Sequence, residues 1–246
     1  MSEHQSTSSW VRLFLYLMLI NLGISMVGIA GRMLLDWPPL TVFHLFFYGA
    51  QLGLVLALIG LIQLLFGFFK KQKPHVKAGV LTLVLGLTPL ALALLAVGVA
   101  GFKAPMIHDI STDLDNPPEY SITNSLRTAA ENSLVYAGDA IASQQRSAFP
   151  DIQPLITSMS VDDARAQSLR TVEALDWILV VSDESTGSIE AYDKSRVFGF
   201  IDDVVIRISA IEGGSQIDVR SNSRVGLGDL GANANRIRRF FQRFAQ

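Results

Sequence analysis

The chain has 246 residues, a formal net charge of −2 and no cysteine. The lack of cysteine excludes disulfides, thiolate catalysis and cysteine-ligated zinc. Residues 1–103 carry 7 Lys plus Arg against 2 Asp plus Glu, whereas residues 104–246 carry 13 against 20. Because the second part is acidic and lacks the basic footprint of a nucleic-acid-binding protein, no nucleic-acid partner is expected.

Three apolar segments in the first part are each long enough to cross a bilayer, at about 11–31, 40–69 and 78–102. A spanning helix needs about 20 apolar residues, because the hydrocarbon core is about 30 Å thick and each residue rises about 1.5 Å. Buried helices of a soluble protein are the alternative, but three runs of this length with almost no charge disfavour them. The sequence therefore predicts a three-helix transmembrane region over residues 1–103, in contact with the lipid bilayer.

A cluster of lysines between the second and third segments predicts the orientation. The cluster consists of Lys70, Lys71, Lys73 and Lys77. Short loops rich in Lys and Arg stay in the cytoplasm, so the N-terminus is expected inside and everything after residue 102 outside. This predicts a multi-pass protein of the inner (cytoplasmic) membrane, with an extracytoplasmic, periplasmic C-terminal domain.

Small residues recur at helical spacing in the second and third segments, including Gly49, Gly53 and Gly60 in one and Gly79 and Gly86 in the other. Such stripes let helix backbones approach closely in lipid. We expect the two stripes to face each other within one chain, since a short loop joins them. A dimerisation face is the alternative.

The second part predicts a linker followed by one soluble domain. Residues 104–120 form an extended linker, because Pro105, Pro117 and Pro118 oppose helix formation. In the domain, residues 121–246, helices are expected over 139–148, over 160–175 behind a capping box at Ser160–Asp163, and over 233–244. The helix limits within 121–159 stay open.

Four strand signals lie between the last two helices, at 177–181, 188–197, 204–210 and 217–224, with a turn at 184–187. Gly213-Gly214 separates the last two strands and is typical of a two-residue hairpin turn. The predicted fold class is α+β: three transmembrane helices, then a two-layer domain in which helices cover one face of an antiparallel meander.

The soluble domain resembles a bacterial and plastid family known as domain of unknown function 1499. The residues that carry the resemblance are Gly199–Asp203, Arg207, Asp218–Ser221, Ser223, Arg224, Gly226, Asp229–Gly231, Asn233 and Arg236–Arg238, with His108–Ile110, Asp113 and Pro117-Pro118 as an entry segment. Members often carry a membrane-spanning N-terminal part. The resemblance implies the fold and brings no established activity.

Three motifs suggest chemistry, and each has a simpler explanation. Residues 226–231 spell G-x-G-x-x-G, but no βαβ unit surrounds them, so we expect a loop that enters a capped helix. His108 with nearby aspartates could ligate a metal, yet a solvated linker explains them equally well. Asp202 and Asp203 are adjacent on a strand, so their side chains should point to opposite faces rather than form a catalytic pair.

The final hairpin has an arginine-rich face. A turn at Gly213-Gly214 would place Arg207 opposite Arg220 and Asp203 opposite Arg224, on a sheet face that the predicted helices leave uncovered. Like charges in register are unfavourable unless another group neutralises them. Asp218 could do so in a structural ladder, which we favour. Alternatively, the face binds an anion, with the candidate ligand-binding residues Arg207, Arg220, Arg224, Asp218 and Asp203.

The sequence predicts no catalytic residue, no metal ligand and no cofactor. The leading hypothesis is a non-enzymatic, membrane-tethered binding or scaffolding module of the cell envelope, whose partner is an envelope protein or an anionic small ligand. The alternative is an enzyme that acts on an anionic envelope substrate through the Arg/Asp hairpin face.

Overall fold

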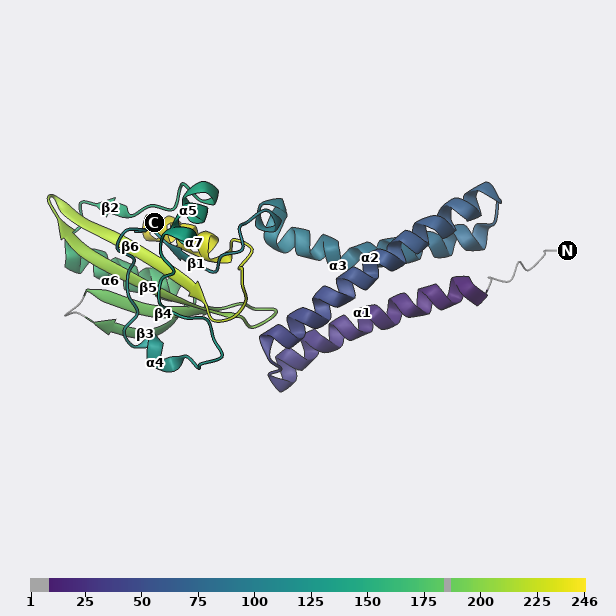
Figure 1. Cartoon of the computed structure of the whole chain (residues 1–246), viewed down its shortest axis with the longest axis horizontal. Helices are drawn as coiled ribbons and strands as arrows, with labels where there is room; N and C mark the ends of the chain where they lie inside the picture. The colour runs from purple at the N-terminus through teal and green to yellow at the C-terminus, as the bar shows by residue number, and fades with distance from the viewer. Residues whose placement is uncertain (1–8, 184–186) are drawn as a thin grey trace. The chain divides into compact units, whose positions relative to one another are not determined.

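The computed structural model describes residues 9–183 and 187–246 (Figure 1). The chain forms two compact units, one ending at Gly98 and the other beginning at Val99. Each unit is described by itself below.

The first unit consists of apolar helices: α1 (Ser9–Leu35), α2 (Pro39–Phe69) and α3 (Lys73–Phe102, whose last residues belong to the second unit). All three are long and apolar enough to cross a membrane, which confirms the prediction of three such segments. α3 contains Pro89, but its departure from helical dihedral angles is at Gly98, where φ is +67°. The chain therefore leaves the long part of α3 at Gly98 and makes one further turn to Phe102.

Glycines bring α2 and α3 together at van der Waals distance. A methyl group on Gly60 would lie 2.7 Å from the Leu83 nitrogen, and one on Gly86 would lie 2.5 Å from the Gly53 oxygen. The expected contact between the two stripes within the chain is thus confirmed for these positions. Gly49 is different, because it faces α1: Asn21 donates a 2.8 Å hydrogen bond to its carbonyl oxygen.

The second unit is built on one antiparallel sheet. Its described strands are β1 (Asp109–Ser111), β2 (Leu155–Thr157), β3 (Ile178–Asp183), β4 (Ser188–Lys194), β5 (Ile201–Ile211) and β6 (Gly214–Ser223). They follow the order β1-β6-β5-β4-β3, and β2 also pairs with β6. The four predicted strands correspond to β3–β6. β1 and β2 have three residues each, too few for an alternating pattern to show.

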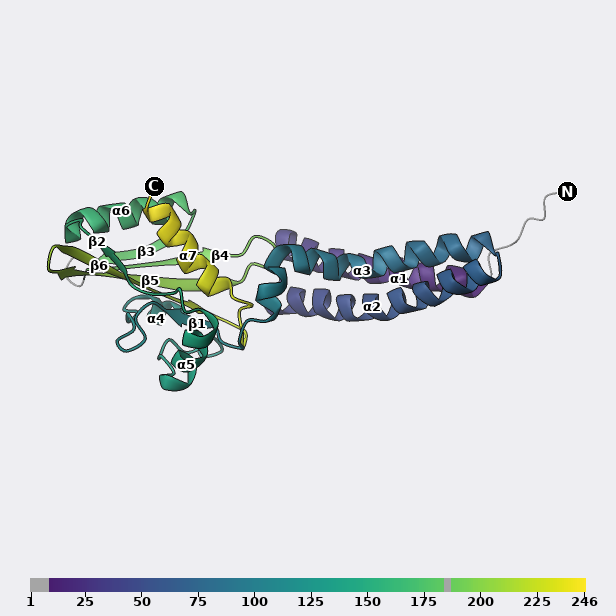
Figure 2. The same cartoon turned by 90° about the horizontal axis from the view of Figure 1, so that it is seen from above.

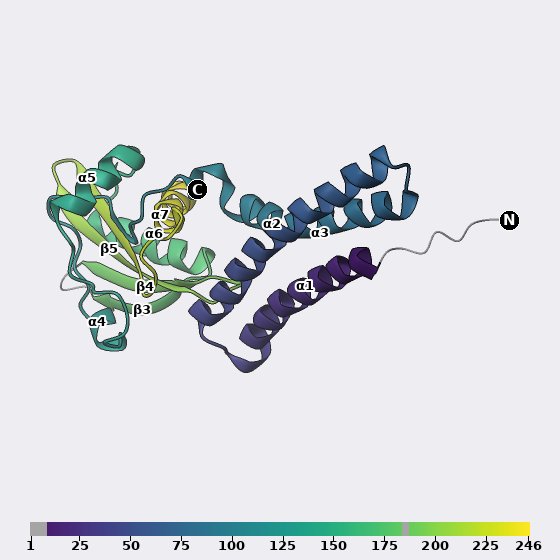
Figure 3. The same cartoon turned by 45° about the vertical axis from the view of Figure 1, so that its right-hand side comes forward.

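Helices α6 (Val161–Ala174) and α7 (Ala232–Phe244) cover one face of this sheet (Figure 2). Figure 3 shows α7 beside α6 on that side. The Ser160 hydroxyl accepts a 3.1 Å hydrogen bond from the Asp163 amide, as a capping box predicts. The helices α4 (Thr123–Leu126) and α5 (Asp139–Ala148) lie on the other side of the sheet. The α+β class is therefore confirmed.

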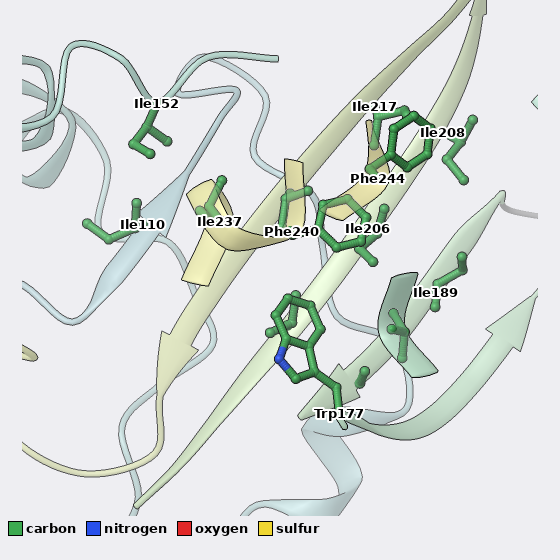
Figure 4. Packing of buried hydrophobic residues seen from close by; sticks show 14 of the residues in the cluster. Ile110, Ile152, Trp177, Ile189, Ile206, Ile208, Ile217, Ile237, Phe240 and Phe244 are labelled. Atoms are coloured by element: carbon green, nitrogen blue, oxygen red, sulfur yellow. The ribbon is translucent and has the colours of Figure 1, made fainter. Parts of the chain in front are cut away.

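The hydrophobic core lies between the sheet and α6 and α7. Phe240 and Ile237 of α7 are fully buried and lie over the inward-facing isoleucines of β5 and β6 (Figure 4). Trp177 stacks on Phe240, with ring centroids 5.8 Å apart. The final helix is thus a core element, as its apolar stripe predicts.

Two expectations about loops need comment. The segment 104–120 is not only a linker, because it contains β1, which pairs with β6. In the turn predicted at 184–187, residues 184–186 lie outside the described residues, and Gly187 has a positive φ of +67°.

The hairpin register differs by two residues from the prediction. The turn consists of Glu212 and Gly213, with Ile211 opposite Gly214, so the first glycine and not the pair makes the turn. Gly214 is needed for another reason: β2 pairs beside this part of β6, and a side chain at Gly214 would collide with the Thr157 carbonyl oxygen. Arg207 consequently lies opposite Asp218, and Arg220 lies opposite Val205, so these two guanidiniums do not face each other across the hairpin.

Candidate functional site

The arginine-rich hairpin residues lie on the sheet face opposite the core helices. The expectation that this face is uncovered is wrong. The segment 112–137, which includes α4, covers it, and its backbone and side chains contact the strand residues below. Sequence patterns missed this cover, since the segment has proline and short turns but no helical or strand period. The face is therefore an interior polar layer.

Arg220 lies at the centre of this layer and is only 2% exposed. Its guanidinium donates two hydrogen bonds to the Asp109 carboxylate, at 2.9 and 2.7 Å. It also donates to the carbonyl oxygens of Pro118 (3.1 Å) and Leu134 (2.7 Å). Burial opposes the charge of Arg220, but the hydrogen bonds and negative charge of Asp109, together with Tyr120 and Tyr136, outweigh burial and raise the pKa of the guanidinium. This arginine is thus charged and has partners in β1 and at two positions of the segment 112–137.

Two tyrosine rings contact the same guanidinium, with centroids 5.2 Å away for Tyr120 and 5.3 Å away for Tyr136. The Tyr120 hydroxyl donates to the carbonyl oxygens of Asp203 (3.0 Å) and Arg220 (3.3 Å). Burial raises the pKa of Tyr120 well above its ordinary value and that of Tyr136 to about 12. Both rings are therefore neutral at physiological pH.

Asp203 is fully buried and receives two arginines. Arg224 donates to it through two nitrogens at 3.0 and 2.8 Å, in the bidentate arrangement that carboxylates favour. Arg127, from the covering segment, donates at 2.8 Å and also binds both side-chain and main-chain oxygens of Asn222. Arg224 lies 3.9 Å from a Glu131 oxygen as well. Arg127 and Glu131 thus belong to the site although no sequence pattern marked them.

Arg207 is the most accessible arginine of the layer, with a side chain 23% exposed. One of its nitrogens lies 2.9 Å from Asp218 and 2.9 Å from Asp113. Asp218 is buried and also accepts from Gln216. Arg207 is therefore bound between two carboxylates, one of them partly exposed.

Glu190 of β4 binds the start of α4. Its carboxylate accepts from the amides of Ser121 (2.6 Å), Ile122 (3.2 Å) and Thr123 (2.8 Å). Burial would raise the pKa of Glu190, but the hydrogen bonds from Ser121 and Thr123 outweigh burial and lower it. The ionised carboxylate thus attaches the covering segment to the sheet.

Asp202 points the other way, as predicted from its neighbour Asp203. It accepts a 2.6 Å hydrogen bond from Arg236 of α7, which also contacts Asp193 at 3.0 Å. Asn233 connects this pair to β6, donating to Ser223 and accepting from Ser221. Arg236 is buried, at 3% exposure.

The metal hypothesis at His108 has no convergent ligands. Asp109 contacts Arg220, Asp113 contacts Arg207 and Asp115 contacts Arg146, whereas the His108 ring nitrogen lies 3.4 Å from the Leu227 carbonyl oxygen. Across residues 9–183 and 187–246, no group of three or more His, Asp or Glu side chains could hold a metal ion.

The glycine motif is a loop from an antiparallel strand into α7. Gly226 and Gly231 have positive φ, at +96° and +80°. Asp229 accepts from the amides of Gly231 and Asn233, both at 2.8 Å, and so caps the helix as expected. The βαβ surroundings of a dinucleotide site are not there, because β6 pairs only antiparallel with its neighbours.

Charge counting decides what the polar layer can do. In the described structure, four guanidiniums (Arg127, Arg207, Arg220 and Arg224) meet six carboxylates (Asp109, Asp113, Glu131, Glu190, Asp203 and Asp218). The layer therefore has no excess positive charge, and an anion would have to displace a carboxylate. Its geometry is that of a clamp that joins segment 112–137 to the sheet.

Comparison with known proteins adds the family. No curated protein matches the chain. The family model described as "Protein of unknown function (DUF1499)" matches residues 109–244, from the first residue of β1 to the last residue of α7. The match covers more than half of the chain and all the residues of the polar layer. The chain therefore belongs to the DUF1499 family.

Proposed function

We propose that this chain is a membrane-tethered binding or scaffolding module of the bacterial cell envelope. Its three helices anchor it in the cytoplasmic membrane, and its C-terminal domain lies on the outer side. The three apolar helices support the anchor. Lys70, Lys71, Lys73 and Lys77, between α2 and α3, support the orientation, because such loops stay in the cytoplasm.

The polar layer is the observation that carries the non-enzymatic assignment. Its ionisable groups contact one another at 2.6–3.9 Å, and the two central ones, Arg220 and Asp203, are almost completely buried. A catalytic group needs access to its substrate, whereas a clamp needs complete pairing. A rigid domain with a clamped cover segment suits the presentation of an outer surface to a partner.

That outer surface carries isolated apolar side chains that a partner could cover. Val135 is 81% exposed on the cover segment, and Leu126 and Ile156 are exposed as well. Photo-crosslinking residues placed at these positions of the full-length protein, in the cells that make it, test the proposal. A discrete adduct at some positions and none at others supports a specific partner. If no exposed position of the domain gives a discrete adduct, the proposal of a specific binding partner is refuted.

The second candidate is an anionic ligand or substrate held by Arg207. Its support is accessibility, since Arg207 and its partner Asp113 are both partly exposed and an anion could replace Asp113. Phosphate should then raise the melting temperature of the full-length protein, through mass action. The rise should vanish in Arg207→Ala and persist in Arg146→Ala, a matched control at an exposed ion pair. No rise in the wild type would exclude phosphate as the ligand class.

A further inference from the structure

The end of the C-terminal domain that receives the chain from α3 combines exposed apolar and basic side chains. We define this tether patch by Met106, Val197 and Leu227, with Lys103, Lys194 and Arg196 around them. Met106 is 70% exposed, Leu227 77% and Val197 49%, and the three cations are exposed too. Each apolar residue is at a loop or linker position, where no core packing requires it.

The members of the tether patch lie at one end of the sheet. Gly228 packs on Met106, to which a methyl group at Gly228 would approach within 3.1 Å. The Asp229 amide donates to the Ile107 carbonyl oxygen at 3.2 Å, so the glycine loop is attached to the linker. Val197 lies in the β4–β5 loop, which extends past the pair formed by Lys194 and Ile201.

Covalent length keeps the tether patch close to lipid. Ile107 is already buried in the domain core, so only residues 103–106 separate it from the last residue of α3. Four extended residues reach at most about 14 Å. The last turn of α3, after Gly98, exposes Val99 and Phe102, which also favours an apolar surrounding. A membrane surface is therefore within reach of Met106 in any orientation of the domain.

The charges of the patch favour the same partner. Lys103 is three residues before Met106, and Lys194 and Arg196 precede Val197 at the β4–β5 loop. The exposed Asp176 carboxylate approaches Arg196, at 4.0 Å. Apolar residues ringed by Lys and Arg are typical of segments that bind in the interface of anionic membranes.

We propose that the tether patch docks on the headgroup region of the bilayer that holds the three helices. Met106, Val197 and Leu227 enter the interface, and the cations contact anionic lipids. The glycine motif then has a role: its positive-φ glycines form the tight loop that carries Leu227 outward. Docking fixes which surface of the domain faces away from the membrane. This inference rests on the membrane anchor of the proposed function.

Bromolipid quenching of a fluorescent label in nanodiscs tests the docking. The chain has no cysteine, so each labelled full-length protein carries one introduced thiol. The positions are Leu227→Cys and Val197→Cys in the patch, Glu212→Cys in the β5–β6 turn at the other end of the sheet, and Leu58→Cys in the middle of α2. Apolar interfacial groups sit about 5–10 Å into the headgroup and acyl boundary, so the patch labels should be quenched to about half the extent of the Leu58 label. The Glu212 label should be unquenched.

Two controls separate docking from anchoring and from mere proximity. Quenching at Leu58 without quenching at Leu227 and Val197 would overturn the docking but not the membrane anchor. Lack of quenching at Leu58 would contradict the membrane anchor itself. In the Val197→Cys protein, Leu227→Asp should lower quenching at least about twofold if the patch docks as a unit, because a buried charge opposes insertion. Unchanged quenching would mean that the short linker alone brings the loop near lipid, and would overturn the proposal.

Replacing anionic by zwitterionic lipid should lower quenching at both patch positions, and equal quenching in the two lipids would overturn the contribution of the cations.

Discussion

Replacing Arg220 by methionine should be among the most destabilising single changes in the domain. The substitution keeps an unbranched apolar stem but removes the guanidinium and its charge. The Asp109 side chain, only 4% exposed, is then left without a cation. Breaking a buried ion pair from one side costs about 3–5 kcal/mol, because the remaining charge is buried and uncompensated. Two carbonyl oxygens, of Pro118 and Leu134, lose their donor as well. Since a whole domain is stable by about 5–15 kcal/mol, this loss is a large share.

A double-mutant cycle measures the pair directly. Arg220→Met and Asp109→Asn should each cost about 3–5 kcal/mol, whereas the double variant should cost clearly less than their sum, since neither buried charge remains. Urea unfolding of the full-length protein in detergent gives the free energies. In a Trp10→Phe, Trp37→Phe background, Trp177 is the sole tryptophan and reports on the core, where it stacks on Phe240.

The exposed pair of Arg146 and Asp115 is the matched control. Its side chains are 52% and 92% exposed, so Arg146→Met should cost about 0–1 kcal/mol. If Arg220→Met costs no more than the control, the polar layer is not a clamp and the structural explanation of its arginines is wrong.

Three further predictions concern the core, the acid stability and the helices in the membrane. Phe240→Ala should lower the stability of the domain by about 3–5 kcal/mol in urea unfolding and Phe241→Ala by less, because Phe240 is fully buried and Phe241 only partly; equal effects would contradict this packing. Because its hydrogen bonds lower the pKa of Glu190, its contribution to stability is present above the unfolded pKa, near 4.5, and is lost as the pH falls through the lowered folded value. The free energy of unfolding, measured as a function of pH, should therefore fall less steeply below pH 4.5 in Glu190→Gln than in the wild type. An unchanged profile would show that Glu190 is not the titrating group. Gly79→Leu should separate α2 from α3, because even a methyl group there would lie 2.7 Å from the Gly60 oxygen; an unaltered distance between labels on the two helices would contradict that contact.

Much of the fold follows from patterns with a definite period. The runs in α1–α3 exceed the length of a membrane span, and β3–β6, α6 and α7 show their alternation, capping or apolar stripe in the sequence. β1 and β2 could not be found, because three residues do not complete a pattern. The sequence predicts a hairpin register that differs by two residues, because Gly213-Gly214 resembles a two-residue turn, whereas Gly214 is required by the neighbouring Thr157 of β2.

The candidate site was only half predictable. The five residues named from the hairpin do share one face, because a register error of two residues preserves the faces of a strand. Their partners could not be inferred, since Arg127, Tyr120 and Glu131 belong to an irregular segment whose path depends on tertiary contacts. The net charge of the site, and with it the preference for a clamp over an anion site, depends on those partners.

Membrane topology is the central claim, and reporter fusions to the full chain test it most directly. A reporter that is active only in the cytoplasm, fused after Lys71, should be active, and the same reporter fused after Gln246 should be silent. A reporter active only outside the cytoplasm should give the reverse. Both positions on one side of the membrane, or the opposite arrangement, would contradict an extracytoplasmic domain held by three spans.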